Sequence, residues 1–249
     1  RQFTATVRSI REDMAEEWQI CIAMTMLFGV ADCLPMSEHP FMHTRFFLFL
    51  VCCNITLADD WPQWLGPQRD GVWREKGIVK KFDGAPKLRW KVEIGGGYAG
   101  PAVADGRVYV LDRQLAKGTS NPSNPFSRGQ LPGTERVLCL NEVDGKLLWK
   151  HEYDCPYAIS YPAGPRCTPT VDGDRVYVLG AMGDLFCFKA KTGNLVWKKD
   201  FKKDFGAKVP IWGFAAHPLV DGNKLICLVG GEVVSEANVT FMLFSPKEQ

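Results

Sequence analysis

Four side chains in this sequence are of types that bind ligands or transfer protons, and each stands shortly before a recurring Pro-x-Val or Pro-Leu-Val segment. They are Tyr98, Arg166, Trp212 and His217, with Tyr161 nearby. The Arg166 guanidinium could hold an anion, and the His217 imidazole could serve as a general base or a ligand. The same positions also suit side chains that only orient the entry segments. We therefore treat the four as binding candidates, and the sequence indicates no catalytic residue.

The cysteines allow a second kind of chemistry, disulfide formation. Cys155 and Cys167 lie in one connecting stretch, each beside a proline-containing segment. In an exported protein this pair predicts a disulfide, which would contribute about 3 kcal/mol in the chain-entropy model. Cys139, Cys187 and Cys227 lie within apolar runs, where a thiol acts as a small buried hydrophobe. No carboxylate cluster has calcium-ligand spacing, so no metal site is expected.

These residues are carried on a repeat. Residues 136–150 align with 184–198 at an offset of 48 without a gap, and 101–111 align with 169–179, sharing the letters RVYVL. A third copy of the latter follows at 218–228. The aligned pairs include Cys139 with Cys187, Gly145 with Gly193, Leu147 with Leu195, and Trp149 with Trp197. A supersecondary unit that recurs in this way predicts a repeat architecture.

Each repeat contains four short apolar runs separated by Asp-Gly or Thr-Gly turn signals. A period near 48 residues with four antiparallel strands per unit predicts β-propeller blades. The fold class is therefore all-β, a partial propeller with about three incomplete blades. Because a closed ring of this type takes roughly seven or eight blades, we interpret the sequence as an N-terminal fragment.

Trp90, Trp149 and Trp197 recur at one position of the outer strand, which predicts that each packs between neighbouring blades. The turns on one face of the predicted propeller are tight. The connections on the other face are long and span residues 113–135, 151–168 and 199–216. The first of these contains the polar stretch 114–135, interpreted as an irregular excursion with no core role. Loop-borne function is expected on this long-loop face.

The N-terminal part has the layout of a secretory leader, with Arg45, an apolar run at 46–53 and small residues before Asp59. That run is too short to span a bilayer, so no stable membrane span is expected after cleavage. A net charge of +2, with acids among the lysines, argues against nucleic acid as a partner. The predicted division is 1–41 as a non-native upstream segment, 42–58 as the signal peptide, 59–86 as an N-terminal docking segment, 87–231 as the partial propeller and 232–249 as an atypical tail.

The recurring x-D/T-G-x-x-x-W pattern, together with "DDWPQWLGPQRDGVW" at 59–73, resembles exported pyrroloquinoline-quinone-binding-like (PQQ-like) β-propeller repeat proteins. This family is grouped by fold with the outer-membrane assembly factor BamB. The resemblance covers about residues 59–231. The vicinal disulfide that quinone-dependent alcohol dehydrogenases of this fold carry is missing, because Cys52 and Cys53 fall inside the predicted leader.

The resemblance implies one of two functions. The first is an exported, non-catalytic scaffold of the periplasm or cell envelope, which binds a protein or another envelope component through the long-loop face and needs no cofactor. The alternative is a quinoprotein-like dehydrogenase that uses pyrroloquinoline quinone and Ca²⁺. The fold does not choose between them, because function belongs to the site.

Overall fold

The computed structural model describes residues 3–8, 59–77, 81–230 and 241–244. The chain divides into two compact units, the first formed by Arg1–Val7, Asp60–Arg74 and Leu88–Gln249, the second by Arg8–Asp59 and Glu75–Lys87. In the described part of the second unit, the backbone amide of Asp59 donates to the carboxylate of Glu75. The predicted signal peptide at 42–58 lies outside the described residues.

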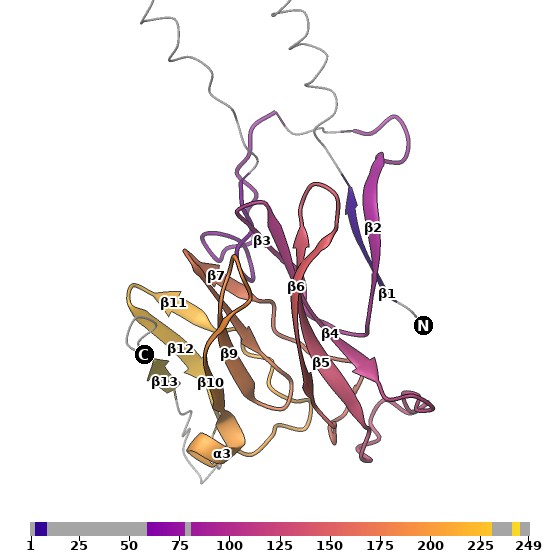
Figure 1. Ribbon diagram of the computed structural model, residues 1–249, viewed down its shortest axis with the longest axis vertical. Coiled ribbons are helices and arrows are strands. Elements are labelled where there is room, and N and C mark those ends of the chain that lie inside the picture. Colours follow the sequence, from indigo (N-terminus) through magenta and orange to yellow (C-terminus); the bar gives the residue numbers. More distant parts are fainter. Residues whose placement is uncertain (1–2, 9–58, 78–80, 231–240, 245–249) are drawn as a thin grey trace, which may run out of the picture. The chain divides into compact units, whose positions relative to one another are not determined.

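The first unit is built from antiparallel sheets (Figure 1). One four-stranded sheet contains β3 (Ala102–Ala104), β4 (Arg107–Leu115), β5 (Gly133–Asn141) and β6 (Leu147–Asp154). A second contains β7 (Thr170–Asp172), β8 (Arg175–Leu179), β9 (Asp184–Lys189) and β10 (Leu195–Asp200), after which comes the short helix α3 (Phe201–Phe205). A third contains β11 (Leu219–Asp221), β12 (Lys224–Leu228) and β13 (Phe241–Phe244). Strand β2 (Leu88–Ile94) pairs with β1 (Phe3–Arg8).

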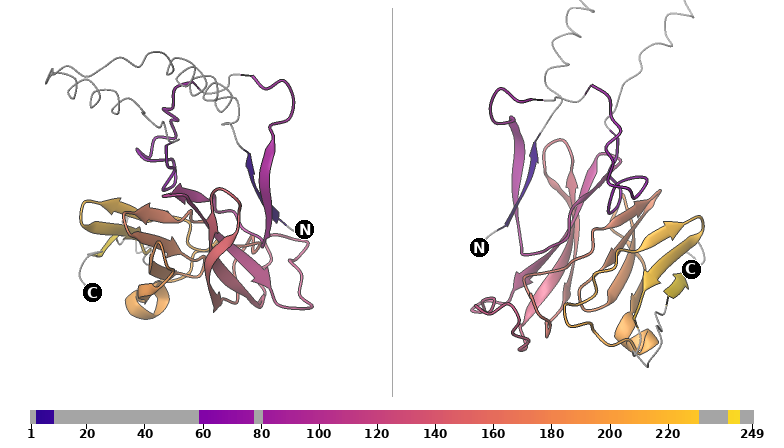
Figure 2. Two further views of the ribbon diagram at one scale, coloured as in Figure 1. Left: turned by 45° about the horizontal axis from the view of Figure 1, so that its top comes forward. Right: turned by 180° about the vertical axis from the view of Figure 1, so that it is seen from behind.

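The three larger sheets follow one another as blades, each with its strands in chain order (Figures 1 and 2). This is the predicted all-β partial propeller. Two of the blades are complete, with four strands each, where the sequence predicted about three incomplete ones. The repeat period located the blades correctly because each copy of the sequence forms the same part of a blade.

The RVYVL strands are buried on both faces because blades cover them from both sides. Val108–Leu111 in β4 and Val176–Leu179 in β8 are all at most 3% exposed. A strand covered on both sides favours a continuous apolar run over strict alternation of apolar and polar residues. The two RVYVL copies therefore have the same residues because their packing environments are alike.

Each tryptophan of the repeat joins its own blade to the next one. The indole N–H of Trp90 donates to the carbonyl oxygen of Glu142 at 2.7 Å, and that of Trp149 to Ala190 at 2.9 Å. Glu142 and Ala190 are themselves equivalent under the offset of 48. Trp197 lies in the apolar cluster that contains Leu225 and Cys227 of the third blade. The predicted inter-blade tryptophans thus lie at inter-blade positions.

The turn glycine of each blade makes room for the tryptophan of the blade before it. Gly145 and Gly193 have φ values of 71° and 73°, in the left-handed region that favours glycine. A Cβ on Gly145 would lie 2.7 Å from the Trp90 ring, and one on Gly193 would lie 2.5 Å from the Trp149 ring. Glycine is therefore required at these turns for both its backbone freedom and its lack of a side chain.

Two predicted boundaries differ from the structure. Strands β4 and β5 extend into the stretch predicted as an irregular excursion, so only 116–132 remains outside them. Arg113 pairs directly with Glu135, so the β4–β5 ladder continues into this stretch and both strands are longer than predicted. Part of the predicted atypical tail, Phe241–Phe244, forms β13 and pairs with β12 as the third strand of its blade.

Cys155 and Cys167, the pair predicted to form a disulfide, are both free thiols in the structure. The two cysteines are buried in different apolar clusters. Cys155 packs with Tyr157 and Ile159, whereas Cys167 packs with Tyr177 and other residues of the second and third blades. The Cys167 thiol donates to the carbonyl oxygen of Ala216 at 3.5 Å. Nearness in sequence predicted the bridge, but the chain between them turns their side chains into separate layers.

Candidate functional site

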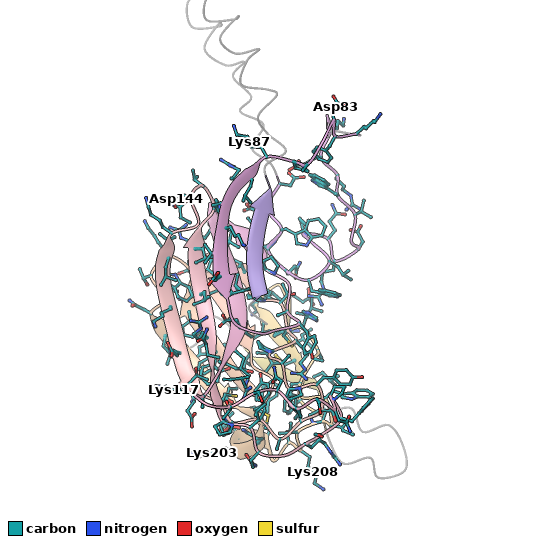
Figure 3. The ribbon with its side chains drawn as sticks, turned by 90° about the vertical axis from the view of Figure 1, so that its right-hand side faces the viewer. Asp83, Lys87, Lys117, Asp144, Lys203 and Lys208 are labelled. Carbon is teal, nitrogen blue, oxygen red and sulfur yellow. The ribbon has the colours of Figure 1, made fainter. Side chains whose placement is uncertain are left out.

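The long connections gather at one end of the blades. The 116–132 excursion and helix α3 both lie at the lower end in Figure 1, whereas the β5–β6 turn lies at the opposite end. Figure 3 labels Lys117 and Lys203 at the long-loop end and Asp144 at the tight-turn end. The face that the sequence predicted to carry function is therefore formed by loops from successive blades.

Ser160 ties three of these connections together. Its backbone amide donates to the carbonyl oxygen of Ile211 at 2.8 Å, and its hydroxyl to that of Phe126 at 3.3 Å. The next amide, of Tyr161, donates to the carbonyl oxygen of Pro125 at 2.6 Å. Ser160 is 1% exposed, so these bonds are shielded from water. One dipeptide thus fixes the excursion and the 199–216 connection against the 151–168 connection.

Tyr161 adopts a backbone conformation that is rare for a residue with a side chain. Its φ is 54°, in the left-handed region. Such a conformation costs of order 1–3 kcal/mol and persists only where surrounding bonds hold it. The left-handed turn projects the ring to the surface, where it is 37% exposed and meets Phe126 edge-on at 5.2 Å.

Arg166 stabilises this turn through hydrogen bonds to its backbone. Its guanidinium donates to the carbonyl oxygens of Ser160, Tyr161 and Gly164, and it lies 5.2 Å from the centre of the Tyr98 ring. Burial lowers the pKa of Arg166 from its usual value. Because three carbonyls occupy its donors, Arg166 acts here as an organiser of the loops, which is the second of the two roles the sequence left open.

Together these bonds display a group of large apolar side chains. We call it the long-loop surface, and its members with their exposed fractions are Tyr98 (52%), Phe126 (59%), Tyr161 (37%), Ile211 (50%) and Trp212 (56%). Rigid aromatic side chains held at a surface are the usual anchors of protein interfaces. The loops around them, 116–134, 155–168 and 205–217, contain Lys117, Arg128, Arg166 and Lys208 and no acidic residue. These loop segments therefore carry basic residues together with the exposed apolar side chains, and the acidic residues of the 199–216 connection, Asp200 and Asp204, precede residue 205.

A buried carboxylate lies beneath the loops. Glu135 is fully buried and accepts hydrogen bonds from the hydroxyls of Tyr153 and Tyr157 and from the amide of Ala181. Burial raises the pKa of Glu135, although these bonds partly oppose the shift. The Arg113 guanidinium stacks on the Tyr157 ring at 3.9 Å. This network holds the start of the 151–168 connection against the second blade.

His217 does not join the other three candidates. Its ring stacks on Trp64 of the N-terminal docking segment, with ring centres 4.6 Å apart. Burial, and then the nearby charge of Arg69, lower the pKa of His217. That segment crosses the inner strands, since Trp61 bridges to Val103 of β3. The structure thus brings Tyr98 and Arg166 together with Trp212 close by, and assigns His217 to a separate contact.

Sequence reasoning missed several members of this site. Phe126 was included in a stretch interpreted as having no core role, and Ile211 carried no motif. Ser160 is a common residue between Ile159 and Tyr161 and belongs to no motif, so nothing in the sequence distinguished it. The one available signal was Phe126, an aromatic residue in an otherwise polar stretch, since exposed loops seldom retain large apolar side chains without use.

The quinone and calcium of the dehydrogenase alternative were tested against the residues present. Within the described ranges, no group of three or more His, Cys, Asp or Glu side chains is placed to hold a metal ion. Glu135, the carboxylate beneath the long loops, is engaged by two tyrosines. Arg166 is engaged by carbonyls. The described residues do not fit this cofactor pair. In the same part of the chain, no helix is long and apolar enough to cross a membrane.

Comparisons with known proteins find one curated relative and several solved structures that are similar to this chain. Tetrathionate hydrolase of Acidithiobacillus ferrooxidans is 27% identical over 199 residues, which cover 75% of this chain and 38% of that protein. A quinohemoprotein alcohol dehydrogenase of Pseudomonas putida HK5 shares 24% identity at a TM-score of 0.35, over 57% of this chain and 18% of its own. BamB of Moraxella catarrhalis shares 16% identity at a TM-score of 0.28, over 56% and 46%. The chain spans less than half the length of each.

A family model described as "Outer membrane protein assembly factor BamB" matches residues 133–240. The matched stretch includes the whole of the second blade, β7–β10, together with β5 and β6 before it and β11 and β12 after it. Its blades are the antiparallel four-stranded sheets that the sequence repeat predicts, joined by the tryptophans of that repeat. The matched residues 133–240 are therefore similar to the PQQ-like β-propeller repeats of this family.

Proposed function

We propose that this chain is a non-catalytic binding module of the cell envelope, whose long-loop surface docks a protein partner. The observation that supports it most strongly is the exposure of five large apolar side chains on loops that buried hydrogen bonds hold in place. Exposed apolar patches of this kind mark interaction sites. Loops fixed before binding also reduce the conformational entropy lost on association.

The charge around the patch indicates what the partner carries. Lys117 and Arg128 are exposed on the excursion, and Lys208 is exposed on the 199–216 connection. A partner that fits this surface has an apolar patch with acidic residues around it. Complementary charges at the edge of an interface increase the association rate and select the orientation of the partner. Its affinity therefore falls as salt rises, since surface charges are screened.

Site-specific photo-crosslinking in the source cells tests the proposal. A photoreactive phenylalanine analogue replaces Phe126 in one variant and Trp212 in another. As a matched control it replaces Val143, which is 65% exposed at the β5–β6 turn, away from the long loops. The proposal predicts that Phe126 and Trp212 crosslink to the same protein and that Val143 does not. Crosslinks from Val143 alone, or none from either long-loop position, would contradict it.

A further inference from the structure

A second site lies beside the first blade, on residues that the long-loop surface does not use. A cleft of about 670 Å³ opens between the end of β2, the end of β4 and residues 119–121 of the excursion. This volume falls within the roughly 300–1,000 Å³ of small-molecule sites. We propose that this cleft binds an uncharged saccharide.

The floor of the cleft is rigid. Gly96 and Arg113 exchange two backbone hydrogen bonds, of 3.0 and 2.8 Å, which fix the end of β2 to β4. A Cβ on Gly95 would lie 2.2 Å from the carbonyl oxygen of Arg113, and one on Gly96 would lie 2.2 Å from that of Ala163. The backbones therefore touch directly, which fixes the floor of the cleft.

The two arginines at the cleft are already engaged by other groups of the protein. Arg136 donates from Nε to Asp112 at 2.8 Å and forms a second bond to the same carboxylate through Nη2. Asp112 is 1% exposed and also accepts from the amide of Gly95. Arg113 donates to the carbonyl oxygens of Leu131 and Pro162, on the side of the blade that faces Tyr157. Because both arginines are engaged, the cleft offers no free cation to a phosphate or carboxylate ligand.

Apart from the exposed carboxylate of Glu93, which can accept hydrogen bonds from hydroxyl groups, the groups that remain available are neutral donors and acceptors. The side chains of Gln114, Ser120 and Asn121 are exposed at the cleft, and within the described ranges none of them takes part in a hydrogen bond. The Thr119 hydroxyl donates to the carbonyl oxygen of Ala116 and can still accept. Amides and hydroxyls that both donate and accept match the hydroxyl groups of a sugar ring. Ile94 supplies an apolar edge for the ring's C–H face.

The wall that carries three of these groups, residues 119–121, is an addition to the common blade. In the second blade, β8 and β9 are joined by residues 180–183 alone, whereas the first blade inserts 116–132 at the equivalent point. Ser120 and Asn121 belong to this insertion. It is held by hydrogen bonds from Ala116 to Pro132 and from Thr119 to Ala116. The structure thus links an insertion unique among the described complete blades to a formed cleft.

Titration of the full chain with maltose, cellobiose and chitobiose, followed by saturation-transfer NMR, tests this inference. We expect at least one of these neutral disaccharides to bind at millimolar concentration. The double variant Gln114→Ala/Asn121→Ala should raise its dissociation constant by about tenfold or more, since about 1.4 kcal/mol corresponds to a factor of ten. Gln130→Ala, an exposed glutamine of the same insertion away from the cleft, should change it by less than about twofold.

Three outcomes would overturn the inference. They are no binding of any of the three disaccharides, binding that the double variant leaves unchanged, and preferential binding of inorganic phosphate in a parallel titration. The inference stands apart from the proposed protein partner, because the photo-crosslinks from Phe126 and Trp212 do not involve the cleft residues.

Discussion

The indole ring of Trp149 occupies the space that a side chain on Gly193 would fill, since a Cβ there would lie 2.5 Å from the ring. Gly193 belongs to the second blade and Trp149 to the first. The same relationship joins Gly145 to Trp90, one blade earlier. The repeat therefore encodes an interlock in which each blade is completed by its neighbour.

Alanine at Gly193 should weaken this interlock. Gly193→Ala combines the cost of a left-handed residue, about 1–2 kcal/mol, with overpacking of about 1–3 kcal/mol against Trp149. Gly173→Ala is the matched control, because Gly173 has a φ of 53° and nothing within 4 Å of its Cβ position. Urea unfolding should give a clearly larger loss of unfolding free energy for Gly193→Ala. Equal losses for the two variants would exclude the interlock as a source of stability.

The two copies of RVYVL offer a second matched pair. The Tyr109 hydroxyl donates to the carbonyl oxygen of Ala190 at 3.2 Å, whereas the buried Tyr177 hydroxyl has no hydrogen-bond partner among the described residues. We expect Tyr109→Phe to lower the free energy of unfolding by about 1 kcal/mol and Tyr177→Phe to leave it unchanged or raise it. Thermal unfolding of both variants measures the difference. A larger loss from Tyr177→Phe would show that its hydroxyl is bonded in solution.

Glu135 should make stability depend on pH. Its pKa is raised above the ordinary 4.5 by burial, so the folded state favours the neutral carboxyl. The contribution of Glu135 to the free energy of unfolding is fully present below the ordinary pKa. It is lost as the pH rises through the raised pKa of the folded state. Arg113, Cys155, Asp184 and the two bonded tyrosines, Tyr153 and Tyr157, also act on this group.

The variant Glu135→Gln stays neutral and should remove that dependence. Relative to the variant, the wild-type free energy of unfolding should fall as pH rises from acid to alkaline. Glu152→Gln is the control, because a hydrogen bond from Lys150 lowers the pKa of that exposed carboxyl, so its effect has the opposite sign. Parallel pH profiles for wild type and Glu135→Gln would mean that Glu135 titrates as it does in the unfolded chain.

Cys155 and Cys167 should both be found as thiols. Burial raises the pKa of each well above its usual value, which leaves little reactive thiolate. Peptide mapping of unreduced protein, alkylated only after unfolding, should therefore recover both residues carrying the alkyl label. A linked peptide containing the two unlabelled cysteines would restore the predicted disulfide.

The parts of the structure that follow the repeat were predictable from sequence, and the parts that depend on loops were not. Trp149 and Gly193 recur at a fixed offset, so their shared role as packing elements could be inferred from spacing alone. Ser160 binds Phe126 and Ile211, which lie in connections of different length and no periodicity. Loop conformation depends on such contacts between distant segments, and a single sequence does not display them.

The burial of charged side chains could not be predicted from the sequence either. Glu135 stands at the edge of a polar stretch, which predicted exposure, yet two tyrosines from the next connection enclose it. Asp112 and Arg136 were not singled out, although their pairing helps to shape the cleft beside β2. In both cases the ladder between β4 and β5 continues beyond the apolar core and carries polar residues into buried positions.

Affinity for the crosslinked partner tests most directly whether the long-loop surface carries the binding function. Calorimetric titration with wild type, Trp212→Ala and Val143→Ala compares an anchor with an exposed apolar residue of the opposite end. We expect Trp212→Ala to raise the dissociation constant by about tenfold or more and Val143→Ala to change it by less than about twofold. Equal affinities for wild type and Trp212→Ala, or an equal loss in Val143→Ala, would contradict it.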